Sequence, residues 1–277
     1  MICIQLILLT DKKGCDILSK VISVISGKGG VGKTTVTANV GVALSMLGHK
    51  TVIIDTDLGL RNLDLALGLE NNVIYDMVDL VTDKCRLREA IIKDERYGNL
   101  GFIPTSQFKT DSVIDYYKFE KIVSELKKQY EYIIIDSPAG IGEGFEAAAK
   151  LSDIALIVVN PEPFSLRDAD RVAGLLEDLG VKDMRLVVNR IRPDMVGRGI
   201  MLNIDAVIEA LGIRLAGVIY EDMAVIERAI CGTPIVLDEK SSTGQNFINI
   251  AKRINGENIA IQNIRKKSLW AKLFKRK

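Results

Sequence analysis

Short apolar runs, rich in valine and isoleucine, recur along the chain, and most of them end in a polar residue. Runs of this kind are typical of parallel strands that are buried on both faces of a sheet. They span residues 21–25, 51–55, 132–136, 155–160, 185–189 and 215–219. Helical patterns lie between them, at residues 35–47, 118–129, 144–151, 166–179, 204–211 and 224–230.

This alternation of strand and helix predicts an α/β fold in a single domain, with a mostly parallel sheet that has helices on both faces. Polar residues end four of the strands: Asp55, Asp136, Asn160 and Asn189. Ligands of such sheets bind beyond the carboxyl ends of the strands. Four polar residues at one edge therefore favour a binding site over simple strand endings.

We divide the chain into four parts. Residues 1–20 form an N-terminal extension of unknown role, which is interpreted either as an extra strand or as the result of an upstream start codon. Residues 21–256 form the main α/β domain, and residues 257–267 form a linker. Residues 268–277 form an amphipathic C-terminal helix.

Composition and charge narrow the class of protein. The 277 residues include four scattered cysteines without a C-x-x-C pair, which argues against a disulfide framework or a zinc site and fits a reducing cytosol. The net charge is +1, yet seven basic residues and no acidic residue lie between positions 265 and 277. A mildly acidic body with a basic tail points to an anionic partner for the tail.

The segment after the first apolar run carries the most specific motif. Residues 27–34 fit the pattern G-x-x-x-x-G-K-[ST] of a phosphate-binding loop (P-loop), in the strand–loop–helix context that the motif requires. We expect Lys33 to reach the β- and γ-phosphates of ATP and Thr34 to bind Mg²⁺. A second lysine, Lys28, lies inside the loop. The predicted nucleotide contacts here are Gly27, Lys28, Gly29, Gly30, Val31, Gly32, Lys33, Thr34 and Thr35.

Three carboxylates near the strand ends complete the predicted chemistry of ATP hydrolysis. Asp57 is the candidate for positioning the attacking water. Asp55 and Asp136 are the candidates for holding Mg²⁺, through bound water, together with Thr34. Because Asp-rich loops that contain glycine are also common turns, the alternative is that Asp57 is only a turn residue.

The C-terminal segment predicts an amphipathic helix that lies in a membrane interface. Leu269, Trp270, Leu273 and Phe274 share one arc of a helix. The opposite side carries Lys272, Lys275 and Arg276. Bulky apolar residues opposite basic ones are typical of helices at anionic lipid surfaces. The alternatives, a solvated basic tail or an arm for nucleic acid, explain the apolar residues poorly.

Taken together, these motifs resemble the ParA/MinD family of ATPases, whose P-loop contains the additional lysine (the deviant Walker A motif). Segments 28–34, 57–64, 136–141, 160–162, 167–171 and 198–199 resemble its MinD branch, the septum-site-determining ATPases. The resemblance implies a homodimer formed with ATP, in which Lys28 acts on the phosphates bound by the partner. Lys28, Lys33 and Asp57 are then the catalytic residues.

The resemblance also assigns residues outside the P-loop. It implies that Asn62 lies in the first switch and Asp136 in the second, and that Asn189 and Arg190 lie beside the adenine. Asp168 and Asp170 match positions at the dimer and partner surface. Tyr220 departs from the family pattern, which usually has proline there, and residues 1–20 have no counterpart in the family.

The implied function is an ATP-hydrolysing switch that regulates the placement of the division septum. Its implied cofactors are ATP and Mg²⁺, and its implied location is cytoplasmic, reversibly peripheral on the inner face of the cell membrane. Its implied partners are anionic lipids, a MinC-like division inhibitor and a MinE- or DivIVA-linked protein that stimulates or positions it. No nucleic acid is expected.

Alternative functions share the same loop. A ParA-type DNA-partitioning ATPase would need no apolar and basic tail, and a flagellar-number regulator of the same superfamily is disfavoured by the sequence Asp136-Ser-Pro-Ala-Gly140. A protein with an iron–sulfur cluster would need cysteine near the second switch, and residues 136–146 contain none. A metabolic kinase would need a pocket for a small substrate, for which the sequence offers no residues.

Overall fold

One sheet of eight strands organises the molecule. The computed structural model describes residues 18–59, 61–107 and 115–261. The strands lie in the order β3-β4-β2-β5-β1-β6-β7-β8, and all pairs are parallel except β3 with β4. Their bounds are β1 Lys20–Ile25, β2 Thr51–Asp55, β3 Ile92–Lys93, β4 Leu100–Ile103, β5 Tyr132–Asp136, β6 Ile154–Val159, β7 Asp183–Ile191 and β8 Arg214–Tyr220.

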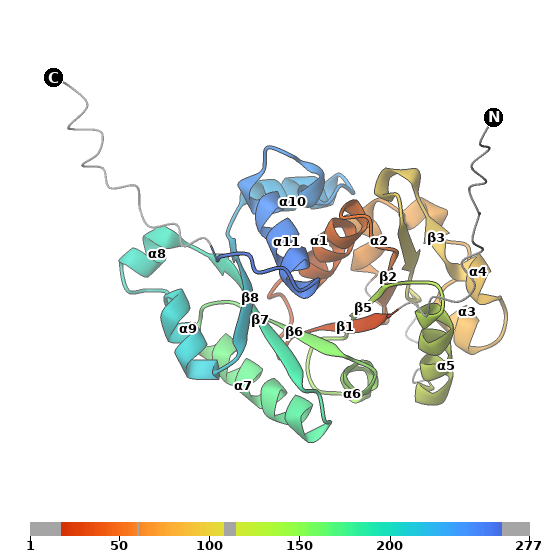
Figure 1. Ribbon diagram of the computed structural model, residues 1–277, viewed down its shortest axis with the longest axis horizontal. Coiled ribbons are helices and arrows are strands. Elements are labelled where there is room, and N and C mark those ends of the chain that lie inside the picture. Colours follow the sequence, from red (N-terminus) through yellow and green to blue (C-terminus); the bar gives the residue numbers. More distant parts are fainter. Residues whose placement is uncertain (1–17, 60, 108–114, 262–277) are drawn as a thin grey trace, which may run out of the picture.

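Helices cover both faces of this sheet (Figure 1). The longer ones are α1 Lys33–Met46, α5 Tyr116–Lys127, α6 Glu143–Lys150, α7 Pro163–Asp178, α9 Ile204–Leu211, α10 Met223–Ile230 and α11 Ser242–Ile254. The shorter ones are α2 Asn62–Leu67, α3 Met77–Val81, α4 Leu87–Ala90 and α8 Pro193–Gly197, with 3-10 turns at Glu70–Asn72, Glu95–Tyr97 and Ile235–Leu237. Among the described residues, no helix is long and apolar enough to cross a bilayer.

Alternation of side chains along the strands explains why their sequences are apolar throughout. In β5, Ile134 belongs to the core beneath α1 and α11, whereas Ile133 and Ile135 pack on the other face with Phe119 of α5. A strand with both faces covered has no position that must be polar. The predicted fold class is therefore confirmed, and the predicted strands and helices all occur with bounds that agree within three residues.

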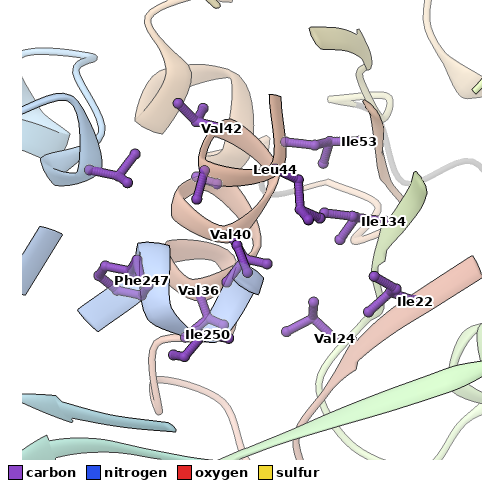
Figure 2. Close-up of a cluster of buried hydrophobic side chains, with 14 of the residues drawn as sticks. Ile22, Val24, Val36, Val40, Val42, Leu44, Ile53, Ile134, Phe247 and Ile250 are labelled. Carbon is purple, nitrogen blue, oxygen red and sulfur yellow. The ribbon is translucent and has the colours of Figure 1, made fainter. Parts of the chain in front are cut away.

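Helix α1 lies at the centre of one face, between the sheet and α11. Figure 2 shows Val36 and Val40 of α1 close to Phe247 and Ile250 of α11, with Ile134 of the sheet on the other side. Eleven of its 14 residues are buried, so the helix is held from several directions. Because α1 begins at Lys33, within the last two residues of the predicted P-loop motif, this packing fixes the end of the loop relative to the sheet.

Several elements were not predicted. Strand β4 is only four residues long and contains a glycine, and β3 has two residues, so neither gives a clear sequence signal. Helix α11 does carry an apolar stripe, at Phe247, Ile250 and Ile254. Near the end of this helix, the side chain of Arg253 donates hydrogen bonds to the carbonyls of Ile259 and Ala260, which lie beyond the helix. The first residues of the predicted linker thus lie against the domain.

The strand order creates a crevice above β1. Strand β1 lies between β5 and β6, and the chain leaves it toward β2 on one side and later returns to β6 on the other. Such a switch point opens a crevice at the carboxyl ends of the strands, where ligands bind in sheets of this kind. The predicted P-loop follows β1 directly and therefore lies at this crevice.

Candidate functional site

The P-loop connects β1 to α1, and its backbone is shaped for an anion. Gly30 and Gly32 have φ values of 80° and 95°, which L-residues with side chains rarely adopt. Gly32 is also the N-cap of α1, so no side chain caps this helix. By contrast, a side chain caps each of five other α-helices among the described residues: Asp76 in α3, Asp115 in α5, Asn203 in α9, Asp222 in α10 and Ser241 in α11. The first amides of α1 are therefore left for a ligand such as phosphate.

Below the loop, Asp136 collects three donors from α1. Lys33 Nζ lies 3.0 Å from Asp136 Oδ1, and Thr37 Oγ1 donates to the same oxygen at 2.8 Å. Thr34 Oγ1 donates to Asp136 Oδ2 at 2.9 Å. Both Lys33 and Asp136 are buried, so the ammonium has a fixed position directly under the loop.

Asp55 lies beside Asp136, because the two residues end neighbouring strands in matching register. Burial, and after it the charge of Asp136, raises the pKa of Asp55 well above its usual range. The backbone N–H of Asp57 donates to Asp55 Oδ1 at 2.9 Å, which holds the start of the next loop. Two adjacent buried carboxyl groups with one lysine form a place where additional positive charge is favourable.

The hydroxyl, carboxylate and ammonium groups around Asp136 fit the Mg²⁺ and ATP that the sequence predicts. The described residues contain no group of three or more His, Cys, Asp or Glu side chains that could enclose a metal ion by themselves. Mg²⁺ in nucleotide sites does not need one, since it keeps water ligands and binds phosphate oxygens with one or two protein groups. The Thr34 hydroxyl and the carboxylates of Asp55 and Asp136 supply such groups.

A pocket of about 720 Å³ extends from the loop toward β8. Gly32, Thr34 and Thr35 line one end, and Asn62 contributes from the start of α2. The other side is formed by residues near the carboxyl end of β7 (Asn189 and Arg190) and by residues at and after the end of β8 (Tyr220, Glu221 and Asp222). The structure thus brings three of the predicted phosphate residues into one pocket with the predicted adenine residues, and Tyr220 lies in its wall.

The ends of β7 and the P-loop are in direct contact. Asn189 Nδ2 donates to the Val31 carbonyl at 2.7 Å, and Arg190 Nη1 donates to the Gly30 carbonyl at 3.1 Å. Sequence reasoning placed Asn189 and Arg190 beside the adenine, and it gave no sign that they bind the loop. No local pattern could show this, because the contacts join residues 158 and 160 positions apart.

Other predicted residues lie apart from this pocket. Lys28 is exposed on the loop, and its ammonium has no hydrogen bond or ion pair with any described residue. Asp57 lines a second pocket of about 260 Å³, together with Phe119, Pro138 and Glu143. At the end of β6, Asn160 donates its backbone N–H to Ser165 Oγ.

Two further groups of predicted residues concern surfaces. Asp168 and Asp170 lie on α7, where Asp170 is exposed and Asp168 is half-buried. A Cβ on Gly27 would lie 2.6 Å from the carbonyl oxygen of Asp168, so the loop packs directly on α7. The predicted membrane residues Leu269, Trp270, Lys272, Leu273, Phe274, Lys275 and Arg276 lie outside the described residues.

Sequence reasoning also missed two threonines that hold Asp136. Thr37 donates to its carboxylate, and Thr56 Oγ1 donates to its backbone carbonyl at 2.8 Å. Thr37 follows Lys33 by one helical turn, so it shares the face of α1 that carries the lysine. That spacing was the available signal.

The arrangement can bind a nucleotide and support phosphoryl chemistry. The loop amides and Lys33 would hold phosphate oxygens, while the Thr34 hydroxyl and the two carboxylates would hold the ion. When bound, Mg²⁺ neutralises the charge that develops on those oxygens. Asp57 lies two residues after Asp55, at the predicted position of a group that orients water.

Comparisons with known proteins agree with this geometry. Residues 19–182 match the protein family described as AAA domain. The septum site-determining protein MinD of Bacillus subtilis is 41% identical over 260 residues, which cover 92% of this chain and 97% of that protein.

Solved structures give the same result. A chain in the MinC:MinD cell division protein complex of Aquifex aeolicus superposes with a TM-score of 0.83 and 45% identity, covering 88% of this chain and 99% of that one. The septum site-determining protein MinD of Pyrococcus horikoshii, solved with Mg-ADP, gives a TM-score of 0.77 and 31% identity, with coverage of 86% and 96%.

Proposed function

The chain belongs to the MinD family of septum site-determining ATPases, and we propose from this premise that it is an ATP-driven switch whose dimerisation controls attachment to a membrane. Hydrolysis of ATP with Mg²⁺ and a role in placing the division septum follow from the family. The proposal concerns how the chain couples ATP hydrolysis to its role in septum placement. In it, ATP brings two subunits together, and the dimer attaches to the inner face of the cell membrane more firmly than one subunit does.

The observation that carries the proposal is the contrast between the two lysines of the P-loop. Lys33 is already paired with Asp136, whereas Lys28 is exposed and its ammonium has no partner among the described residues. A lysine held at the mouth of a phosphate site is free to bind phosphates presented by another subunit. We propose that Lys28 acts in this way, across the dimer.

Hydrolysis would then depend on residues of the same subunit. We propose that Lys33 binds the phosphates, that Thr34, Asp55 and Asp136 hold Mg²⁺ in part through water, and that Asp57 positions the attacking water. The short contacts among these groups support the proposal, since their side chains are positioned before ligand binds.

Helix α7 is the proposed surface for the dimer and for protein partners, through Asp168 and Asp170. Its support is the direct packing of Gly27 on Asp168, which links the surface to the nucleotide loop. Because the Aquifex relative was solved in a MinC:MinD complex, we propose that a MinC-like division inhibitor binds this chain. A MinE- or DivIVA-linked protein is the proposed stimulating or positioning partner.

The C-terminal helix is the proposed membrane anchor. Its four apolar residues would enter the interface, and each basic residue near an anionic surface contributes about 1 kcal/mol. A helix this short binds weakly alone, whereas two copies on a dimer gain avidity of ~10²-fold or more. ATP-dependent dimerisation would thus convert weak binding into stable attachment.

Co-sedimentation with anionic vesicles tests this coupling. We expect the full chain to sediment with vesicles in the presence of ATP and much less with ADP. The fluorescence of Trp270, the only tryptophan, should shift to shorter wavelength under the same conditions. As matched variants, Leu273→Glu should abolish vesicle binding without changing ATP affinity, and Lys28→Ala should reduce binding with ATP to the level seen with ADP.

Two results would contradict the proposal. A Trp270 shift with double-stranded DNA, and none with vesicles, would favour the DNA-partitioning alternative. Equal vesicle binding with ATP and with ADP would show that nucleotide does not control attachment.

A further inference from the structure

Two consecutive residues at the end of β7 hold two consecutive carbonyls of the P-loop. Asn189 Nδ2 donates to the Val31 carbonyl at 2.7 Å, and Arg190 Nη1 donates to the Gly30 carbonyl at 3.1 Å. Asn189 is buried and Arg190 is exposed. We refer to this pair of contacts as the β7 clamp.

The backbone of β7 is distorted where the clamp occurs. Arg190 has φ of 56°, one of three non-glycine residues with positive φ among those that the structure describes. The pairing of β7 with β8 also shifts register between Val188 and Ile191, as at a β-bulge. Bulges and left-handed residues cost free energy and are found where a strand must redirect its side chains near a site. Here the distortion directs neighbouring side chains toward the same loop.

The loop is fitted closely to the clamp. A Cβ on Gly32 would lie 2.3 Å from Asn189 Nδ2, so any other residue at this position would push the amide away from Val31. Gly32 is therefore needed for its positive φ and also for the space that Asn189 occupies.

The clamp determines where the amides of the loop point. The chain has no cis peptide among the described residues, and in a trans peptide the C=O and the following N–H point in opposite directions. When Arg190 and Asn189 hold the carbonyls of Gly30 and Val31, the N–H groups of Val31 and Gly32 are turned away from β7. Two neighbouring amides that face one side form an anion-binding concavity.

From these contacts we propose that Asn189 and Arg190 are positioning residues of the P-loop, which orient its amides toward phosphate before nucleotide binds. Because both residues also line the base end of the 720 Å³ pocket, they couple occupation of that end to the phosphate end. The inference rests on nucleotide binding at this site. It is independent of dimerisation and of membrane attachment.

A contact with the base alone is the competing explanation, and two ligands separate the explanations. MgADP and Mg-pyrophosphate share a diphosphate, but only ADP has a nucleoside. If Arg190 positions the loop, Arg190→Ala should weaken both ligands by a similar factor of about tenfold, the size of one charge-assisted hydrogen bond. If Arg190 contacts only the base, the affinity for pyrophosphate will not change.

The measurement is calorimetric titration of the full chain, with the melting temperature of each variant recorded. Arg190→Lys keeps a cationic donor and should recover part of the affinity for both ligands. Arg214→Ala removes an exposed arginine at the first residue of β8, at the end of the strands away from the P-loop, and should change neither affinity. Loss of ADP affinity without loss of pyrophosphate affinity would overturn the proposal, as would no loss of either.

Asn189 gives a second, independent readout. Asn189→Asp replaces the donating amide by a carboxylate, which cannot donate to the Val31 carbonyl and should weaken pyrophosphate at least as much as Asn189→Ala does. Both substitutions at position 189 should raise KM for ATP and leave kcat within about twofold, because the side chain at this position acts on the loop and not on the reacting atoms. A lowered kcat with unchanged KM would contradict a positioning role. If the wild-type chain binds both ligands but fails on vesicles, the proposed function fails while this inference stands.

Discussion

The P-loop has an inner half, around Lys33, and an outer half, around Lys28. The two halves differ in how many of their polar groups are paired within one chain. In the inner half, Lys33 is buried and pairs with Asp136, which also receives hydrogen bonds from Thr34 and Thr37. In the outer half, Lys28 is exposed and its ammonium has no partner among the described residues. The same residue type thus occurs in two opposite environments within six positions of sequence.

The difference follows from the energetics of burial. A buried ammonium requires a carboxylate, because the free energy of removing a charge from water must be offset by pairing. An exposed ammonium is hydrated, so it has no such requirement and remains able to bind a ligand. The inner half is thus held within one chain, whereas the outer half is the part that we propose to bind phosphates of another subunit.

Lys33→Ala should produce the largest effect, because it damages the inner half in two ways. Asp136 would lose its ammonium partner while Asp55 lies beside it, which should cost about 3 kcal/mol in the free energy of unfolding. Affinity for MgADP should fall at least about 100-fold, since a phosphate ligand is lost. Urea unfolding and calorimetric titration measure the two effects. A stable variant would show that the buried pair is not what holds this region.

Asp57→Ala should separate hydrolysis from binding. Asp57 lines a different pocket from the loop and the base residues, so affinity for MgADP should change less than about twofold. Loss of a group that orients the attacking water should lower kcat by about 100-fold. An ATPase assay at saturating ATP measures this, and the variant should still form the ATP dimer. Normal turnover would remove Asp57 from this role.

Lys28→Ala tests the outer half directly. Because its side chain is exposed and makes no hydrogen bond or ion pair with a described residue, the free energy of unfolding should not change, and affinity for MgADP should stay within about twofold. Self-association with ATP should weaken by about 30-fold, the size of a lost charge-assisted contact with phosphate. Light scattering with ATP and with ADP measures this. An intact ATP dimer would show that Lys28 does not act across the interface.

The sequence predicted the inner half better than its surroundings, and the reason is distance along the chain. The P-loop motif is contiguous, and its glycines specify the backbone directly, so Lys33 and Thr34 could be assigned from a short segment. Asp55 and Asp136 could be assigned because parallel strands bring their ends to one edge. These inferences need only local patterns and one topological rule.

The contacts that were missed depend on tertiary packing. Arg190 binds Gly30 only because β7 is distorted at its end, and no pattern around residue 190 indicates that distortion. Strand β4 was missed because four residues with a glycine give no periodic signal. Helix α11 does carry an apolar stripe, but weak helix formers such as Asn246 and Asn249 in the same helix obscure its helical signal.

Thr37→Val should give the smallest of these effects, and it tests a single hydrogen bond of the inner half. Thr37 is fully buried, and its hydroxyl is one of two donors to Asp136 Oδ1. Valine has nearly the same shape, so the change removes a hydrogen bond to a charged group with little change in packing, at a cost of about 1–2 kcal/mol in the free energy of unfolding. Thr35→Val is the matched control, because Thr35 lines the pocket on the same helix and its hydroxyl bonds to none of the described residues. Urea unfolding should therefore show a lower free energy of unfolding for Thr37→Val and an unchanged one for Thr35→Val. Equal losses would mean that the valine substitution itself, rather than the contact with Asp136, determines the result, and the contacts of Lys33 and Thr34 would then remain as those by which α1 holds Asp136.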